Sequence, residues 1–419
     1  MKICLLASEF YPSYGGVGRT FTFMCKAFKD VNEKLFIFNS SYRGKNIFDI
    51  LDSFPDYNLK DLLLLLKNRT HFYYFLISIW KIITAKQIKF YSRLNMLLLL
   101  INRPKILIKL IKNLTSVYPM LKKIKPDLIY GSSCGNTELP LGFVLSRLLK
   151  KKFICSAHGT DFLVRYHYSF KTHYLKALDK IIVHSDRLKD LIKKINHLDD
   201  KQLEIIPPGL YLPNYDINQE KDQIRQELNI QADDFVLISV GRHVPRKNFQ
   251  IVIEAVKQIK KKLPKSQIKY FLIGKGEETQ KLKNLVKNYH LQSEVIFPGA
   301  VNDNMKNKYL KASDVFIMPS ISLSISIEGF GLVYLEANIY KLPVIGTITG
   351  GISEAIEHGK SGLLIKPNDL GGLIDAITHL YDHSEERIRM GEYGYKRVLN
   401  NYDWESIKKV YVKLFQELI

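Results

Sequence analysis

Short apolar runs, each followed by a polar loop and a helix-like segment, recur through most of the chain. Runs of this kind are typical of strands in a parallel sheet, because helices cover both of its faces. The first half contains six such runs: Lys2–Ala7, Lys34–Phe38, Leu128–Tyr130, Phe153–Ala157, Lys180–His184 and Leu203–Ile206. The second half contains five: Phe235–Val240, Tyr270–Ile273, Val295–Phe297, Val315–Met318 and Val344–Gly346. The pattern predicts an α/β protein with two Rossmann-like halves.

A linker between the halves is predicted by Pro207-Pro-Gly209, Pro213 and the polar tract Asn214–Asp222. A chain of 419 residues is too long for one ordinary core, which also favours two domains. We therefore expect an N-terminal domain over 1–213 and a C-terminal domain over 214–400.

The segment 46–125 interrupts the alternation. It contains the apolar stretches Asp61–Leu66, His71–Trp80 and Leu94–Ile111, and between Leu62 and Lys125 it has 13 Lys or Arg and no Asp or Glu. The net charge of the chain, +21, is therefore concentrated here. The pattern predicts a basic helical insertion, which either contacts an anionic membrane surface or packs a small core of its own with solvated lysines. Nucleic acid is not expected as a partner, since no binding motif accompanies the charge.

Neither the apolar tracts nor the cysteines point to export or to membrane insertion. The longest tracts, Phe72–Trp80 and Met96–Ile101, are shorter than the ~20 residues that a membrane span needs. The four cysteines have no CxxC spacing, and Cys4 and Cys155 fall in strand-like runs, as expected of buried free thiols. We expect a cytoplasmic protein, with any membrane contact peripheral and on the inner face.

The stretch Ser326–Glu336 carries the densest candidate chemistry. Two carboxylates, Glu328 and Glu336, flank the glycines Gly329 and Gly331. Glycines let a backbone approach a ligand, and a helix that starts just after them directs unpaired N–H groups toward it. One carboxylate could meet a reacting hydroxyl while the other accepts hydrogen bonds from a ribose diol. The stretch could also be a surface loop followed by an ordinary helix.

Three further polar loops follow predicted strands, where open α/β sheets place ligands. In Gly241-Arg-His-Val-Pro-Arg-Lys-Asn248, the side chains of Arg242, Arg246 and Lys247 predict an anion site. Gly274 begins a second glycine loop. In His158-Gly-Thr-Asp161, His158 could donate a hydrogen bond to a phosphate or sugar oxygen, although a structural histidine is the alternative.

The loop Tyr14-Gly-Gly-Val-Gly-Arg-Thr20 resembles a phosphate loop but has Arg19 where that loop needs lysine. A turn at Gly15 and Gly16 that approaches a ligand is favoured over an ATPase site, and a purely structural turn is the alternative. No DxD pair occurs, and no His/Cys cluster has metal-ligand spacing. We expect neither a metal nor a cofactor.

Taken in order, the glycine pair, HGTD, GRHVPRKN, GKGEE and EGFGLVYLE resemble the retaining nucleotide-sugar glycosyltransferases of the GT-B fold. The closest resemblance is to the family of glycosyl transferases group 1, and it covers residues 1–45 and 126–419. Glu328 and Glu336 are separated by seven residues, the E-x7-E spacing typical of that family.

The resemblance implies a role for each matched residue. Arg242 and Lys247 match the basic pair on the donor diphosphate, Glu336 the glutamate that holds the ribose, and Glu328 the one near the donor sugar. His158 matches the histidine that faces the donor sugar. The remaining matches are backbone positions: Gly15 and Gly16 over the diphosphate or acceptor, and Gly329, Phe330, Gly331 and Leu332 against sugar and phosphate.

The resemblance also implies the architecture and the reaction. Two Rossmann-like domains would face each other across a cleft, and residues 401–419 would form a helix that crosses back to the N-terminal domain. The reaction would be metal-free transfer of a hexosyl unit, with retention, from a UDP- or GDP-sugar to a hydroxyl of a lipid-linked or surface-polysaccharide glycan. A sugar-nucleotide epimerase of the same fold and a non-enzymatic membrane-associated protein are the alternatives.

Overall fold

The chain forms two compact units. The computed structural model describes residues 1–7, 20, 24, 34–39, 69–84, 104–135, 138–162, 168–216, 220–263, 267–324 and 326–419. Unit 1 comprises Met1–Pro207 together with Trp404–Ile419, and unit 2 comprises Pro208–Asp403. The division after Pro207 lies within the Pro-Pro-Gly segment of the predicted linker, six residues before the boundary expected at 213.

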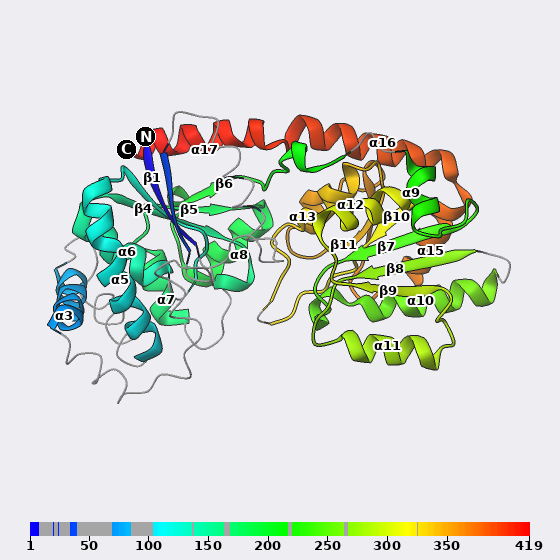
Figure 1. The fold of residues 1–419 in the computed structure, drawn as a ribbon, viewed down its shortest axis with the longest axis horizontal. Coiled ribbons are helices and arrows are strands. Elements are labelled where there is room, and N and C mark those ends of the chain that lie inside the picture. The colour runs from blue at the N-terminus through cyan, green and yellow to red at the C-terminus, as the bar shows by residue number, and fades with distance from the viewer. Residues whose placement is uncertain are drawn as a thin grey trace. The chain divides into compact units, whose positions relative to one another are not determined.

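Unit 1 is built on a six-stranded sheet with the strand order β2-β1-β3-β4-β5-β6 (Figure 1). Every neighbouring pair is parallel. The strands are β1 (Lys2–Ala7), β2 (Lys34–Asn39), β3 (Leu128–Gly131), β4 (Lys152–Ala157), β5 (Lys180–Val183) and β6 (Leu203–Ile205). After its first residue, β1 is fully buried, as expected for a strand covered on both faces.

The helices of unit 1 are α3 (Arg69–Ile83), α5 (Pro104–Ile124), α6 (Glu138–Leu149), α7 (Tyr168–Leu175), α8 (Asp186–Asn196) and α17 (Trp404–Leu418). Short 3-10 turns occupy Thr160–Phe162 and Asp200–Gln202. Helix α8 begins where the Ser185 side chain accepts from the backbone N–H of Leu188, a typical N-cap. Helices α3 and α5 lie side by side (Figure 1), so this part of the predicted insertion is helical.

The C-terminal helix α17 belongs to unit 1 although it follows unit 2 in the sequence. Its aromatic side chains cover the sheet. The ring of Phe415 lies edge-on to that of Tyr130 on β3, with 5.7 Å between centroids, and Tyr411 stacks on Trp404 at 5.6 Å. All four rings are buried, and apolar burial therefore ties the chain end to the unit 1 sheet.

Unit 2 repeats the plan with the strand order β12-β11-β10-β7-β8-β9, again all parallel. The strands are β7 (Phe235–Val240), β8 (Ile268–Ile273), β9 (Val295–Gly299), β10 (Val315–Ile317), β11 (Val344–Thr347) and β12 (Gly362–Ile365). The helices are α9 (Lys221–Glu227), α10 (Phe249–Lys262), α11 (Thr279–Asn288), α12 (Asp303–Ala312), α13 (Leu332–Asn338), α14 (Ile352–Ala355), α15 (Leu370–Asp382) and α16 (Ser384–Asn401). Short 3-10 turns occupy Leu212–Asn214 and Pro245–Lys247.

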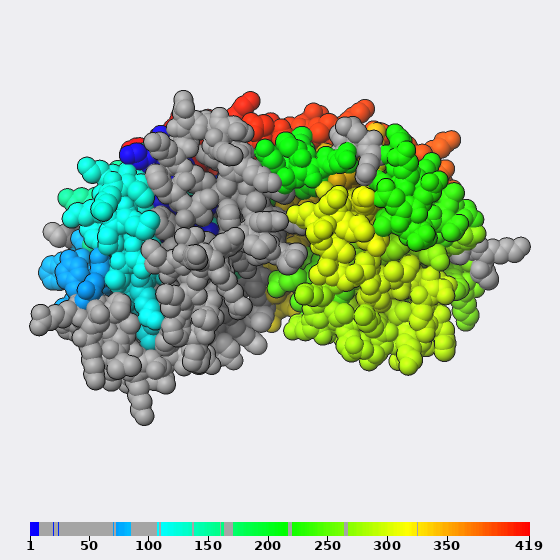
Figure 2. Space-filling view, in the orientation of Figure 1, coloured from blue at the N-terminus to red at the C-terminus, as the bar shows by residue number. Residues whose placement is uncertain are grey.

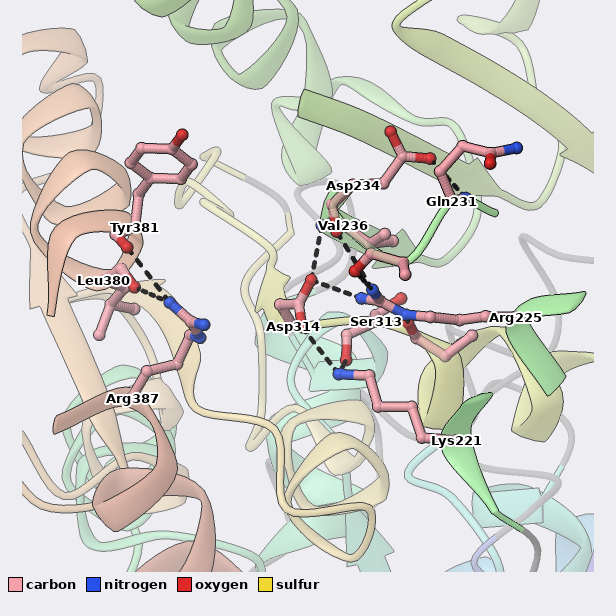
Figure 3. A network of polar contacts seen from close by, with 12 residues as sticks. Lys221, Arg225, Gln231, Asp234, Val236, Ser313, Asp314, Leu380, Tyr381 and Arg387 are labelled. Atoms are coloured by element: carbon pink, nitrogen blue, oxygen red, sulfur yellow. Dashed lines mark hydrogen bonds and ion pairs between the residues drawn. The ribbon is translucent and has the colours of Figure 1, made fainter. Parts of the chain in front are cut away.

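A partly buried ionic network fastens α9, the first α-helix of unit 2, to the sheet (Figure 3). One carboxylate oxygen of Asp314 accepts from Lys221 at 2.7 Å; the other accepts from Arg225 at 2.7 Å and from the backbone N–H of Val236 at 2.8 Å. Arg225 also donates to the carbonyl of Ala312. Because Asp314 immediately precedes β10, these bonds fix α9 against the centre of the sheet.

The predicted α/β class with two parallel sheets is confirmed. All eleven strands predicted from apolar runs are present, with ends that agree to within two residues. Strand β12 was not predicted; its run is short and begins with a glycine. Among the residues that the structure describes, no helix is long and apolar enough to cross a membrane.

Candidate active site

A cluster of cations around one carboxylate forms at the carboxyl end of β7 in unit 2. Arg246 and Lys247 lie on the 3-10 turn Pro245–Lys247, and both form ion pairs with the same Oε2 of Glu328, Lys247 at 2.7 Å. Arg242 is exposed on the same loop and is close enough for its charge to act on Lys247. Two cations therefore share one carboxylate, and with exposed Arg242 the loop keeps an excess of positive charge.

Neighbouring positive charges determine the protonation state of Glu328. Burial tends to raise the pKa of Glu328, but the positive charges of Lys247 and Arg246 outweigh it and hold that pKa at about 2. The carboxylate is therefore ionised at neutral pH. Burial lowers the pKa of Lys247, and Glu328 opposes that shift.

Backbone contacts that only glycines permit hold Glu328 in place. Gly350 has φ +52°, and a Cβ there would lie 2.2 Å from the carbonyl oxygen of Glu328. The next N–H, of Gly351, donates to that carbonyl at 3.0 Å. On the other side, Gly331 has φ +90°, and a Cβ there would collide with the ring of Tyr334. The loop after β11 was not predicted to take part, although its glycine pair, Gly350 and Gly351, comes soon after the predicted strand Val344–Gly346.

Glu336 is held separately, by other partners. It lies in the short helix α13, with only 3% of its surface exposed. Its Oε1 accepts from Lys306 of α12 at 2.8 Å and from the hydroxyl of Tyr215 at 3.1 Å. Lys306 is itself buried. Neither partner was predicted, because in the sequence Lys306 is one lysine among several polar residues of an ordinary amphipathic helix.

The predicted glycine loop at Gly274 has a structural explanation of its own. Gly274 has φ +129°, and a Cβ there would lie 1.9 Å from the carbonyl oxygen of Gly241. The loops after β7 and β8 therefore touch backbone to backbone. Buried His243 lies between them, with its ring edge-on to Phe249 and Phe297, and burial lowers its pKa to about 4.

His158 lies at the carboxyl end of β4 in unit 1, and both of its ring nitrogens are engaged. Nε2 lies 2.8 Å from the carbonyl oxygen of Ser132, and Nδ1 lies 3.0 Å from Nε2 of buried His184. Asp161 fixes the loop, since its carboxylate accepts from the backbone N–H groups of Cys134, His158 and Gly159. His184 and Asp161 were not among the predicted site residues, although each stands near the end of a predicted strand.

The structure thus brings some predicted residues together and separates others. Lys247 meets Glu328, and Arg242 lies nearby. Glu336 has its own buried partners. The backbone positions Gly329, Phe330, Gly331 and Leu332 connect the two glutamates, while His158 belongs to unit 1. Gly15 and Gly16 lie outside the described residues. The residue roles stay predictions.

Two family models match adjacent segments of the chain. Residues 220–397 match the model described as "Glycosyl transferases group 1", and residues 92–212 match "Glycosyltransferase Family 4". Both models describe glycosyltransferases, so the chain is similar to glycosyltransferases over most of its length. The first match lies within unit 2, and the second ends near the start of the linker.

Curated relatives and solved structures agree with these two matches. The "UDP-Gal:alpha-D-GlcNAc-diphosphoundecaprenol alpha-1,3-galactosyltransferase" of Escherichia coli is 28% identical over 74% of this chain and 81% of its own length. The "N-acetyl-alpha-D-glucosaminyl L-malate synthase" of Bacillus anthracis is 28% identical over 64% and 68%. The Anabaena protein HepE, crystallised with UDP-glucose, superposes with a TM-score of 0.72 at 18% identity, over all of both chains, which shows the GT-B fold.

Some curated relatives are matched over less than two thirds of their length. The alignment covers 60% of an uncharacterized glycosyltransferase of Methanocaldococcus jannaschii, 26% identical over 57% of this chain. It covers 58% of a D-inositol 3-phosphate glycosyltransferase of Corynebacterium jeikeium, 29% identical over 57% of this chain.

Proposed function

We propose that this protein is a glycosyltransferase that moves a hexosyl unit from a UDP- or GDP-sugar to a hydroxyl group of an acceptor glycan, with retention at the anomeric carbon. The observation that carries the proposal is the cluster at the end of β7, where Arg246 and Lys247 share Glu328 beside exposed Arg242. Such a set of fixed cations suits a diphosphate, whose charge grows as the glycosidic bond breaks. It lies in the part of the chain that matches the group 1 family.

The proposed reaction needs no metal ion, because the cations of the loop supply the positive charge. Removing one preorganised contact of this kind typically costs ~10²–10³ in rate. Glu328, fixed between Arg246 and Lys247, would lie near the donor sugar. Glu336 would accept from the ribose diol, with Lys306 and Tyr215 keeping its carboxylate in place.

Thermal-shift measurements with UDP-, GDP- and ADP-sugars test the donor site. A ligand that binds only the folded chain raises the unfolding midpoint. We expect one nucleotide class to raise it in the wild type and much less in Arg242→Ala and Glu336→Ala. Lys287→Ala, which removes an exposed lysine of α11, is the matched control and should respond like the wild type. Equal shifts in all four proteins would overturn the donor site.

A lipid-linked or surface-polysaccharide glycan is the proposed acceptor. The name of the Escherichia coli relative includes a diphosphoundecaprenol-linked sugar, and that relative is aligned over most of its length. We expect nucleotide release from the preferred donor to require such an acceptor and to yield a product one hexose longer. Interconversion of the donor sugar without any acceptor would instead identify an epimerase.

We also propose that the basic insertion binds an anionic phospholipid surface. Helix α3 exposes large apolar side chains along one stripe: Tyr73, Leu76, Trp80 and Ile83, with Trp80 61% exposed. The spatially adjacent helix α5 ends in exposed Lys122 and Lys123. Figure 2 shows atoms of α3 reaching the surface. An exposed apolar stripe and exposed cations on two neighbouring helices, in a segment with no acidic residue, fit a membrane interface.

Vesicle co-sedimentation tests this surface. We expect the chain to bind phosphatidylglycerol vesicles and to lose most binding in the double variant Tyr73→Ser with Trp80→Ser. Ile388→Ser removes an equally exposed side chain from α16 and should leave binding unchanged. Clustered cations near such a surface contribute ~1 kcal/mol each, so raised salt should weaken binding. Equal binding by the double variant and the wild type would contradict the proposal.

A further inference from the structure

The short loop between Glu328 and α13 packs through one aromatic side chain. Of its three residues, Gly329, Phe330 and Gly331, only Phe330 has a side chain beyond a hydrogen atom. The Phe330 ring lies 5.7 Å from the ring of Tyr402, the residue directly after α16. Both rings are buried, and both residues belong to unit 2. Tyr402 therefore contacts the only side chain by which this loop can pack.

Tyr402 is in turn held by Arg397 of α16. The guanidinium of Arg397 lies over the Tyr402 ring, 4.8 Å from its centroid, and Nη2 donates to the Tyr402 hydroxyl at 2.8 Å. The same guanidinium donates to the carbonyl oxygens of Glu354 at 2.6 Å and of Ala355 at 2.8 Å. These two residues end α14, where carbonyl groups have no partner within the helix. Hydrogen bonds from a charged donor are stronger than neutral ones, so Arg397 joins α14 firmly to Tyr402.

Helix α14 leads back to Glu328. Gly351, at the N-terminal end of α14, donates its N–H to the carbonyl oxygen of Glu328 at 3.0 Å. The contacts therefore form a closed ring, which we call the Arg397 network and whose members are, in order, Glu328, Phe330, Tyr402, Arg397 and α14. The network holds the backbone of Glu328 through α14 and the ring of Phe330 through Tyr402. All of its members belong to unit 2.

We propose that Arg397 and Tyr402 are positioning residues for sugar transfer. They act through Glu328: by fixing its backbone, they keep its carboxylate between Arg246 and Lys247. A displacement of about 1 Å that arises far from the chemistry can cost ~10² in rate, because reacting groups must be held in a narrow geometry. The role in transfer rests on the proposed function. The Arg397 network rests on the contacts alone.

Hydrogen exchange of the full chain without ligand tests the network. We expect Arg397→Met to speed exchange of the Gly351 amide about tenfold or more, since it removes charged hydrogen bonds from the end of α14. Arg397→Lys keeps the charge but presents one nitrogen where arginine has two, so a smaller increase is expected in a milder variant. Arg389→Met removes an exposed arginine of the same helix and should leave that amide unchanged. Wild-type exchange of Gly351 in both Arg397 variants would overturn the network.

Kinetics, expressed per folded molecule, separate positioning from a loss of stability. We expect Arg397→Met and Tyr402→Leu to lower kcat by ~10² with little change in the KM of the donor, because the cations of the β7 loop remain to bind it. Tyr402→Phe keeps the ring against Phe330 and should recover most of the activity lost in Tyr402→Leu, and Arg389→Met should turn over like the wild type. A wild-type kcat in Arg397→Met would overturn the role in transfer. If the wild type transfers no sugar while exchange of Gly351 depends on Arg397, the proposed function fails and the network stands.

Discussion

Two glutamates of one short motif occupy different environments. Glu328 lies on a loop and forms ion pairs with Arg246 and Lys247, whereas Glu336 is buried in α13 against Lys306 and Tyr215. The difference arises because α13 begins just after Gly331, so that only the second glutamate enters the helix. We expect substitutions of the two glutamates to have different consequences.

Glu328→Gln should strengthen nucleotide binding and weaken catalysis. The amide leaves Arg246 and Lys247 with no carboxylate at that site, so an anionic diphosphate gains their full charge. We expect the Kd of the preferred nucleoside diphosphate to fall about tenfold, or ~1.4 kcal/mol, by calorimetry. Turnover should fall, because Glu328 no longer fixes the two cations.

The same variant should be less stable without ligand. Breaking a buried ion pair by removing one partner typically costs about 3–5 kcal/mol. Glu227→Gln, which removes an exposed carboxylate of α9, is the control for loss of charge. It should appreciably change neither the Kd of the nucleotide nor the free energy of unfolding. Weaker nucleotide binding by Glu328→Gln would show that Glu328 contacts the ligand favourably and does not compete with it.

His243 should make the chain sensitive to mild acid. Its pKa is about 4 in the folded chain, against an ordinary value near 6.5. Between these values the unfolded chain binds a proton that the folded chain does not, so stability is full above about pH 6.5 and falls toward pH 4. His243→Leu removes this loss. As the pH falls from 7 to 4.5, we expect the free energy of unfolding of the variant to rise by about 2 kcal/mol relative to that of the wild type. Urea unfolding at each pH measures this difference. A pH-independent difference would contradict this.

At the scale of elements, α9 depends on one largely buried carboxylate. The carboxylate of Asp314 accepts hydrogen bonds from Lys221, from Arg225 and from a backbone N–H of β7 (Figure 3). Arg225 is only 7% exposed. Asp314→Asn leaves the guanidinium of Arg225 without its anion. We expect unit 2 to lose about 3 kcal/mol, measured by urea unfolding with protection of α9 amides followed by hydrogen exchange.

Asp222→Asn on α9 is the matched control. Asp222 is exposed, and its substitution should change stability by no more than about 0.5 kcal/mol. Similar losses in the two variants would show that the network in Figure 3 does not hold the helix.

At the scale of the molecule, the chain enters unit 2 at Pro208 and returns to unit 1 at Trp404. Unit 1 is therefore incomplete until the last residues have been made. Tyr411 of α17, 1% exposed, packs near Tyr130 and on Trp404. We expect Tyr411→Ala to cost unit 1 about 3 kcal/mol and to leave unit 2 unchanged, by hydrogen exchange read separately for each unit. Val410→Ala, on the exposed face of α17, should cost much less. Equal protection of unit 1 in wild type and Tyr411→Ala would contradict this dependence.

The sequence determined the α/β class and most of the strands, because continuous apolar runs suit strands buried on both faces of a parallel sheet. It also identified the strand ends that carry polar side chains. Local signals suffice to predict the strands and their polar ends, since each apolar run and each loop is continuous in the sequence. Strand β12 was not predicted, because an apolar run that begins with Gly362 is only a weak indication of a strand.

Only the tertiary structure decided which side chains are partners. Lys306 lies thirty residues from Glu336, Tyr215 lies 121 residues from it, and His184 lies 26 residues from His158. Nothing in the sequence links such pairs, because burial and sheet order bring them together. Packing also determines protonation. Burial lowers the pKa of His184 and of His243, while the positive charges of Lys247 and Arg246 keep Glu328 ionised. The residue types come from the sequence, but their protonation and their contacts are set by packing.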